Sequence, residues 1–73
     1  MTKLPVLSGR ECVRALEKAG FGVVRQKGSH LMLARDDPPA YVTVPNHKEL
    51  DRGTLKSILR QAGLSVDEFI ALL

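Results

Sequence analysis

The chain has 73 residues, a formal net charge of +3 and a single cysteine, Cys12. A chain this short is expected to form one small domain over residues 1–73. One cysteine excludes an internal disulfide and a zinc site built on paired cysteines, and no apolar run is long enough for a membrane span or a signal peptide. We therefore expect a cytoplasmic protein with no metal, no small-molecule cofactor and no membrane contact.

The first predicted element is a helix that begins after Ser8. Ser8 and Glu11 form a capping-box pattern, in which each side chain bonds the backbone N–H of the other. Apolar residues then follow at helical spacing: Cys12, Val13, Leu16 and Ala19. Gly20 is expected to end this helix, and Cys12 is interpreted as a small core residue.

Three strands are predicted in the middle of the chain. Residues 21–25 are rich in β-forming types, Gly28 makes a turn, and residues 30–35 form the second strand. Residues 36–39 are Asp-Asp-Pro-Pro and are predicted to be a turn, because proline cannot donate to a strand ladder. The third strand is predicted over residues 41–44.

Alternation along a strand places successive side chains on opposite faces of the sheet. One predicted face is aliphatic and carries Leu31, Leu33, Val42 and Val44. The other carries His30, Met32, Ala34, Tyr41 and Thr43, provided that the strands pair in that register. His30 is therefore expected to lie opposite the aliphatic core with an accessible imidazole.

Two helices are predicted in the C-terminal part. Asp51 is the expected N-cap of the first, which ends at Gly63 and has an apolar stripe of Leu55, Ile58, Leu59 and Ala62. Ser65 and Glu68 form a second capping box before a short helix whose apolar side is Val66, Phe69, Ile70 and Leu73. The order α-β-β-β-α-α predicts a small α+β domain, with a three-stranded antiparallel sheet and helices on one face.

The segment Lys27-Gly28-Ser29-His30 carries the most functional information. The Gly28 turn leads a histidine into the start of a strand, and cations flank it at Arg25, Lys27 and Arg35. An imidazole can exchange a proton near neutral pH while the cations hold a phosphate, which indicates an RNA-handling site. The alternative is a surface or half-buried histidine without chemistry.

A basic stripe lies on the helix predicted after Asp51. Arg52, Lys56 and Arg60 are spaced i, i+4 and i+8, away from the apolar stripe. They form either a ridge that binds RNA phosphates or an ordinary solvated helix face.

A second proton-transfer group is less evident. His47 follows the third strand and could approach His30, or it could be a loop residue that hydrogen-bonds the start of the next helix. Ser29 is a weaker auxiliary candidate, because no base with an orienting partner surrounds it. Asp36 and Asp37 share one turn with no third acid near them, which argues against a two-metal nuclease.

An ordered set of motifs resembles the HicA toxin family. The motifs are Gly28-Ser29-His30, Val44-Pro45-x-His47, Gly53-Thr54-Leu55-x-x-Ile58-Leu59-x-x-Ala62-Gly63-Leu64-Ser65 and Glu68-Phe69. The resemblance extends from the helix at Gly9 through Phe69. It implies a fold similar to a double-stranded-RNA-binding domain and a small ribonuclease, or mRNA interferase, from a HicAB toxin–antitoxin module.

The resemblance also implies roles for particular residues and partners. His30 occupies the position of the family's catalytic histidine, and the implied partners are mRNA and a HicB-like antitoxin. Many members carry a second histidine directly after the first, where this chain has Leu31. The loop at residues 36–39 often contains glycine in the family but not here.

Three functions stay open at this point. The first is a metal-independent RNA endonuclease, the toxin of a type II toxin–antitoxin system. The second is a non-catalytic module that grips A-form RNA through its shape and 2′-hydroxyls, which would have no need of an imidazole at position 30. The third is a HicA-like chain that only binds its antitoxin and regulates indirectly.

We expect the antitoxin to cover the sheet face and edge that hold His30. Met32, Ala34 and Tyr41 would form the apolar centre of that interface, with the cations around it. The alternative is that the chain's own terminal residues cover Met32 and Tyr41.

Overall fold

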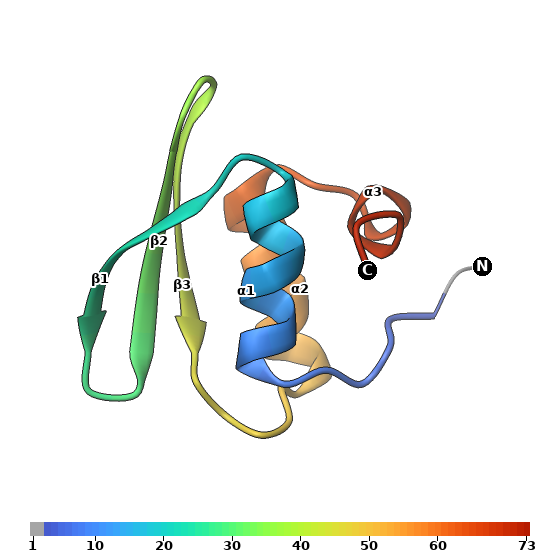
Figure 1. The fold of residues 1–73 in the computed structure, drawn as a ribbon. Coiled ribbons are helices and arrows are strands. Elements are labelled where there is room, and N and C mark those ends of the chain that lie inside the picture. The colour runs from blue at the N-terminus through green and yellow to red at the C-terminus, as the bar shows by residue number, and fades with distance from the viewer. Residues whose placement is uncertain (1–2) are drawn as a thin grey trace.

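A computed structural model describes residues 3–73 and shows a helix, a three-stranded sheet and two further helices (Figure 1). The helices are α1 (Gly9–Lys18), α2 (Arg52–Ala62) and α3 (Val66–Ile70). The strands are β1 (Gly22–Lys27), β2 (His30–Asp36) and β3 (Pro39–Pro45), paired antiparallel in the order β1-β2-β3. The predicted α+β fold is confirmed. No helix within residues 3–73 is long and apolar enough to cross a membrane.

Capping side chains determine where the helices begin. The Ser8 hydroxyl accepts a hydrogen bond from the Glu11 N–H at 3.1 Å, and the Glu11 carboxylate accepts one from the Ser8 N–H at 3.0 Å. Ser65 and Glu68 form the same pair of bonds at the start of α3. The Asp51 carboxylate accepts from the N–H three residues later at 2.7 Å. These bonds satisfy N–H groups that a helix leaves unpaired, and the three predicted N-caps are confirmed.

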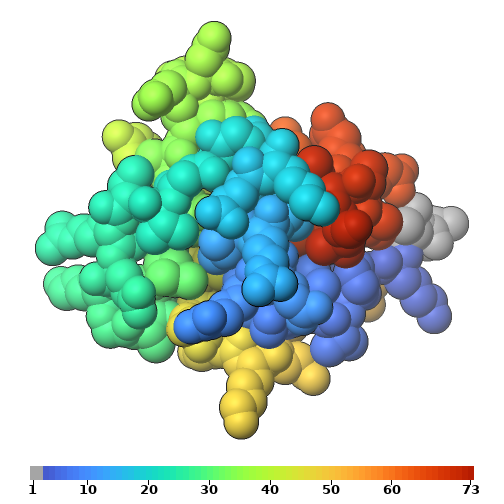
Figure 2. All heavy atoms as spheres, viewed as in Figure 1, coloured from blue at the N-terminus to red at the C-terminus, as the bar shows by residue number. Residues whose placement is uncertain are grey.

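The strands differ in extent from the sequence prediction. Phe21 lies in the core at 3 % exposure instead of starting the first strand, which runs on to Lys27. Pro39 opens β3, a first-residue position at which proline is tolerated because no ladder donor is needed there. The turn is therefore shorter than predicted, with Asp37 and Pro38 at its tip joined by a cis peptide bond. This tip projects beyond the rest of the molecule (Figure 2).

The strand register separates an aliphatic face from a polar one. Leu31 pairs with Val44 and Leu33 with Val42, and the second pair is buried under the helices. The opposite side of the sheet, called the outer face below, carries His30, Met32, Ala34, Tyr41 and Thr43. Both predicted faces are confirmed.

One hydrophobic core fills the space between the sheet and the helices. It joins α1, the aliphatic sheet face, the apolar stripe of α2 and Phe69 of α3. The predicted stripe of α2 is buried in full: Leu55, Ile58, Leu59 and Ala62. The last helix is shorter than expected, because it ends at Ile70. Leu72 packs against the core, while Leu73, predicted to pack, is 49 % exposed.

The two long helices run in the same direction across the sheet. Both begin at the end of the sheet where β1 turns into β2, and both finish toward the β2–β3 turn (Figure 1). The Gly9 N–H donates to the His47 carbonyl at 2.8 Å, and a Cβ at position 9 would overlap the Pro45 carbonyl oxygen. Glycine thus lets α1 start directly against the end of β3. We call this the His30 end of the sheet, and the opposite one the Arg35 end.

Candidate functional site

A tight hairpin turn places His30. Lys27 pairs directly with His30 across the β1–β2 ladder, and Gly28 and Ser29 form the two-residue connection. Gly28 has φ of 59°, and glycine in the first position of such a loop matches the twist of the flanking strands. Residues paired in this way point to one face, with Cβ atoms roughly 5 Å apart. An imidazole and an ammonium group therefore lie side by side on the outer face.

A second cation lies on the same face near His30. Arg25 pairs with Met32, so its side chain shares the outer face with Lys27 and His30. Arg25, Lys27 and His30 are all exposed, and none of the helices within residues 3–73 covers their side of the sheet (Figure 1). Leu31 is half-buried on the opposite face. The position after His30 thus supplies no group to the outer face.

The chain leaving β3 is tied to the same turn. The Asn46 N–H donates to the Ser29 carbonyl at 2.6 Å. The Ser29 hydroxyl makes none of the hydrogen bonds found among residues 3–73, so no bonded base activates it in this structure.

His47 lies two residues beyond Pro45, which is the pairing partner of His30 on β3. Its carbonyl holds the start of α1, and its exposed imidazole is close enough to Asp51 to affect that carboxyl. The pKa of Asp51 is lowered first by hydrogen bonds from Thr54 and, in smaller part, by charge at His47. The structure therefore places His47 at the His30 end, beside the N-cap of α2.

Arg35 lies elsewhere. It is half-buried on the helix-facing side of β2, five residues or roughly 17 Å along the strand from His30. Its Nε donates to the Pro38 carbonyl at 2.9 Å, and its two Nη atoms lie 3.5 Å from the carbonyl oxygens of Ala19 and Ala62. Its guanidinium also lies 4.5 Å from the centroid of the Phe21 ring. Sequence analysis grouped Arg35 with His30, and the structure does not bring them together.

The basic stripe lies on α2, away from the outer face. Arg52, Lys56 and Arg60 are all exposed, and the first and last of them are eight residues apart, or about 12 Å along the helix. Because α2 runs from the His30 end of the sheet to the Arg35 end (Figure 1), its first residue, Arg52, and Arg60 in its last turn lie toward opposite ends.

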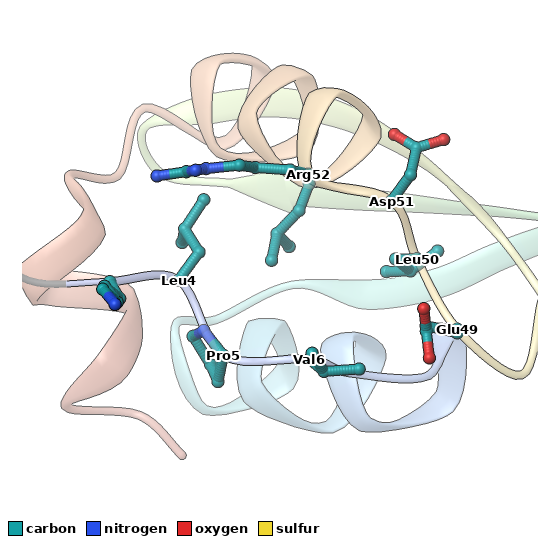
Figure 3. A pocket seen from close by; sticks show the side chains of 9 residues that line it. Leu4, Pro5, Val6, Glu49, Leu50, Asp51 and Arg52 are labelled. Carbon is teal, nitrogen blue, oxygen red and sulfur yellow. The ribbon is translucent and has the colours of Figure 1, made fainter.

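Arg52 also borders a pocket of about 470 Å³ between the N-terminal segment and the start of α2. Figure 3 shows Leu4 and Leu50 within this pocket and the carboxylates of Glu49 and Asp51 at one side. Because cations and carboxylates are mixed there, the pocket has no bias toward phosphate.

The remaining reactive residue types are dispersed. Within residues 3–73, no three His, Cys, Asp or Glu side chains gather closely enough to hold a metal ion. Asp36 and Asp37 are exposed near the tip of the β2–β3 turn, far from His30. Cys12 is completely buried, and burial raises the pKa of its thiol to about 11. At neutral pH this thiol stays protonated, in agreement with its predicted role in the core.

A family comparison covers most of this architecture. The model described as the HicA toxin of bacterial toxin–antitoxin matches residues 9–64. This range runs from the first residue of α1 to just beyond α2, so it includes the whole sheet and the His30 turn. A comparison with curated proteins gave no match. The match spans well over half of the chain, and the chain therefore belongs to the HicA toxin family, whose members are the toxins of bacterial toxin–antitoxin pairs.

Proposed function

We propose that this chain is the toxin of a type II toxin–antitoxin pair and cleaves mRNA in the cytoplasm as a metal-independent endonuclease. His30 is the catalytic residue in this proposal. The observation that carries it is the position of His30, exposed on the outer face and directly opposite Lys27. Family membership supplies the toxin role, and the geometry favours RNA as the target.

RNA contains its own nucleophile, the 2′-hydroxyl. In the proposed reaction the 2′-oxygen attacks the adjacent phosphorus and the 5′-oxygen of the next nucleotide leaves. A base must take the 2′-hydroxyl proton, and an acid must protonate the leaving oxygen. His30 serves as one of these groups, while Lys27 and Arg25 stabilise the extra negative charge on the phosphorane. The products are a 2′,3′-cyclic phosphate and a 5′-hydroxyl.

His47 is the proposed auxiliary group for the second proton transfer. It is exposed, and it follows the strand end that pairs with His30. Ser29 is a weaker candidate, because its hydroxyl has no activating partner. Leu31 replaces the second histidine of many family members, so a paired imidazole at that position has no part in the proposal.

Further phosphate contacts are assigned to the stripe on α2. Arg52, Lys56 and Arg60 lie on α2, on the side of the sheet away from His30, where they would hold RNA that extends beyond the cleaved bond. Arg35 is outside this set, because its guanidinium is engaged with three backbone carbonyls and with Phe21. We assign Arg35 an indirect contribution to RNA binding through the stability of the fold.

The proposed protein partner is a HicB-like antitoxin that covers the outer face. Tyr41 is 77 % exposed there, and Met32 and Ala34 are half-buried beside it. The described terminal segments lie beyond the helices, on the side away from the sheet (Figure 1). The chain's own ends are thus poorly placed to cover this face. An antitoxin on these residues would exclude RNA from His30.

The second candidate function is RNA binding without cleavage. The exposed stripe on α2 favours it, because phosphate contacts need no catalytic group. The two functions differ in whether a covalent product forms.

The decisive assay incubates the purified protein with a defined RNA and identifies the ends of the products. We expect 2′,3′-cyclic phosphate and 5′-hydroxyl ends, and no cleavage of a matched strand that is 2′-O-methylated throughout. EDTA should leave the rate unchanged, because the proposed chemistry uses only side chains. Cleavage that EDTA abolishes and magnesium restores would contradict metal independence. Tight RNA binding with no product would favour the second function.

A further inference from the structure

A cleft of about 240 Å³ lies between α1 and the β1–β2 hairpin, on the helix-facing side of the sheet. Val13 and Leu31 give it an apolar floor, and Arg10, Gln26 and Asn46 stand on its rim. We propose that this cleft binds a nucleobase of the RNA strand, next to the phosphate that His30 acts on. This inference rests on the proposed function and adds a determinant of cleavage specificity to it.

The side-chain amides that line the cleft have hydrogen-bond donors and acceptors that the fold does not use. The chain has three side-chain amides, Gln26, Asn46 and Gln61. The side chain of Gln61, on α2, is already engaged, since it accepts from Thr43 N–H on β3 at 3.1 Å and donates to Ser57 Oγ on α2 at 3.3 Å. Gln26 makes one long bond, from Nε2 to the Gly28 carbonyl at 3.4 Å.

The Asn46 side chain makes none of the hydrogen bonds found among residues 3–73. A free amide presents a donor beside an acceptor. Base edges present the same pair of groups, which is why Asn and Gln side chains recognise bases. The two amides of the cleft are therefore suited to hold the edge of a base.

The other lining residues favour a base over a bare anion. Val13 is buried to 8 % exposure and Leu31 is half-buried, so the floor is an apolar surface that a flat ring could cover. Arg10 and Arg14 are one helical turn apart and exposed, and a guanidinium plane can stack on a base or hold the phosphate attached to it. Glu17 also lines the cleft. Its carboxylate repels a phosphate but can accept a hydrogen bond from a base amino group.

The cleft and the His30 site are built on the same two strands. Leu31 follows His30, and Gln26 precedes Lys27, so the two sets of residues alternate between the two faces of the hairpin. Asn46 is fixed to the hairpin through the bond between its N–H and the Ser29 carbonyl at 2.6 Å. An RNA strand that passes around this end of the sheet would meet His30 and Lys27 on one side and the cleft on the other.

The three side-chain amides permit a direct test by NMR. The ¹⁵N-labelled full chain is titrated with AMP, GMP, CMP and UMP, and with ribose 5-phosphate as the matched ligand that lacks a base. We expect the NH₂ signals of Gln26 and Asn46 to shift saturably with at least one mononucleotide, while those of Gln61 stay in place. Ribose 5-phosphate should leave the signals of Gln26 and Asn46 unmoved.

Two results would overturn the proposal: no shift of Gln26 and Asn46 with any mononucleotide, or equal shifts with ribose 5-phosphate. Because this titration requires no cleavage, it tests the cleft even if the chain proves not to be a ribonuclease.

Matched variants extend the test. Asn46→Ala should weaken mononucleotide binding by about 5-fold, the effect of losing one hydrogen bond. Gln61→Ala removes the same group outside the cleft and should leave the affinity unchanged. On a long RNA, Asn46→Ala should redistribute cleavage among sites. An unchanged affinity in Asn46→Ala, with its fold confirmed by its spectrum, would contradict the assignment.

Discussion

The two ends of the sheet use basic side chains in opposite ways. At the His30 end, Lys27 and His30 are exposed, and their side chains make none of the hydrogen bonds found among residues 3–73. At the Arg35 end, one guanidinium contacts the carbonyls of Pro38, Ala19 and Ala62. Lys27 and His30 are therefore available to a substrate, whereas Arg35 stabilises the fold.

The face of the sheet on which each cation lies, together with the direction of the helices, accounts for this difference. The carbonyl ends of α1 and α2 converge on the Arg35 end, and a cation there is favoured by the partial negative charge of the helix C-termini. The helices begin at the His30 end, where Glu11 and Asp51 cap them with carboxylates. Lys27 and His30 lie on the outer face, away from both helices, so no helix carbonyl is within their reach and they stay in solvent.

The largest expected effect on stability belongs to Arg35. Arg35→Gln should lower the free energy of unfolding by about 2 kcal/mol, because glutamine can replace neither the hydrogen bonds from a charged donor nor the packing on Phe21. The matched change Arg25→Gln removes an exposed cation from the outer face and should stay within about 0.5 kcal/mol of the parent. Urea denaturation measures both. Equal losses of unfolding free energy in the two variants would contradict the proposed difference between the two ends of the sheet.

The turn that carries His30 should show the next largest effect on stability. Gly28→Ala meets no atom within 4 Å, but it forces a left-handed φ of 59° on a residue with a Cβ. We expect a loss of about 1 kcal/mol. Gly22→Ala is the control, since position 22 is equally open and has no left-handed φ. If both variants unfold at the same urea concentration, backbone strain does not shape this turn.

The stripe on α2 should affect RNA affinity and not the fold. We expect a flatter salt dependence when Arg52, Lys56 and Arg60 are changed together to Gln. The slope of the logarithm of the RNA-binding constant against the logarithm of the salt concentration should fall in magnitude by roughly 0.7–0.9 for each phosphate that the variant no longer neutralises. Unrelated RNAs should weaken about equally. Lys18→Gln, a change of one exposed cation on α1, is the control and should keep the slope. An unchanged slope in the triple variant would show that the stripe is only a solvated face.

The smallest expected effect is the pH dependence from the helix caps. Backbone hydrogen bonds lower the pKa of Glu11, Asp51 and Glu68 below their ordinary values of 4.5, 3.8 and 4.5. A carboxyl whose pKa is lower in the folded state contributes stability above its ordinary pKa, and that contribution disappears as the pH falls through the folded value.

Urea midpoints should therefore decrease between about pH 5 and pH 3. Glu11→Gln, which keeps a capping amide without the charge, should reduce this decrease, whereas Glu17→Gln, whose carboxylate caps no helix N-terminus, should preserve it. A pH dependence that is identical in Glu11→Gln and the parent would contradict the assignment.

The sequence predicted the elements and the two faces of the sheet, because capping boxes and alternation are local patterns. It also predicted that His30 lies opposite the core, which the register confirms. The carbonyl groups that Arg35 contacts could not be predicted from such local patterns. Alternation puts Arg35 on the helix-facing side, but only the packing of two helices shows that their last carbonyls meet there. Phe21 was assigned to a strand for its β propensity, and tertiary burial took precedence over it.

The cleft beside α1 could not be predicted from the sequence either. Arg10, Gln26 and Asn46 come from a helix, a strand and a loop, and no spacing in the chain links them. Sequence analysis consequently missed every polar residue on its rim.

The central claim is that His30 performs chemistry and does not support the fold. The most direct measurement compares wild type with His30→Ala, for RNA cleavage by the purified proteins and for unfolding in urea. We predict a loss of cleavage of roughly 10²-fold or more, together with an unchanged unfolding midpoint, because the imidazole is exposed and its removal opens no cavity. A folded His30→Ala protein that cleaves RNA at the wild-type rate would contradict the account.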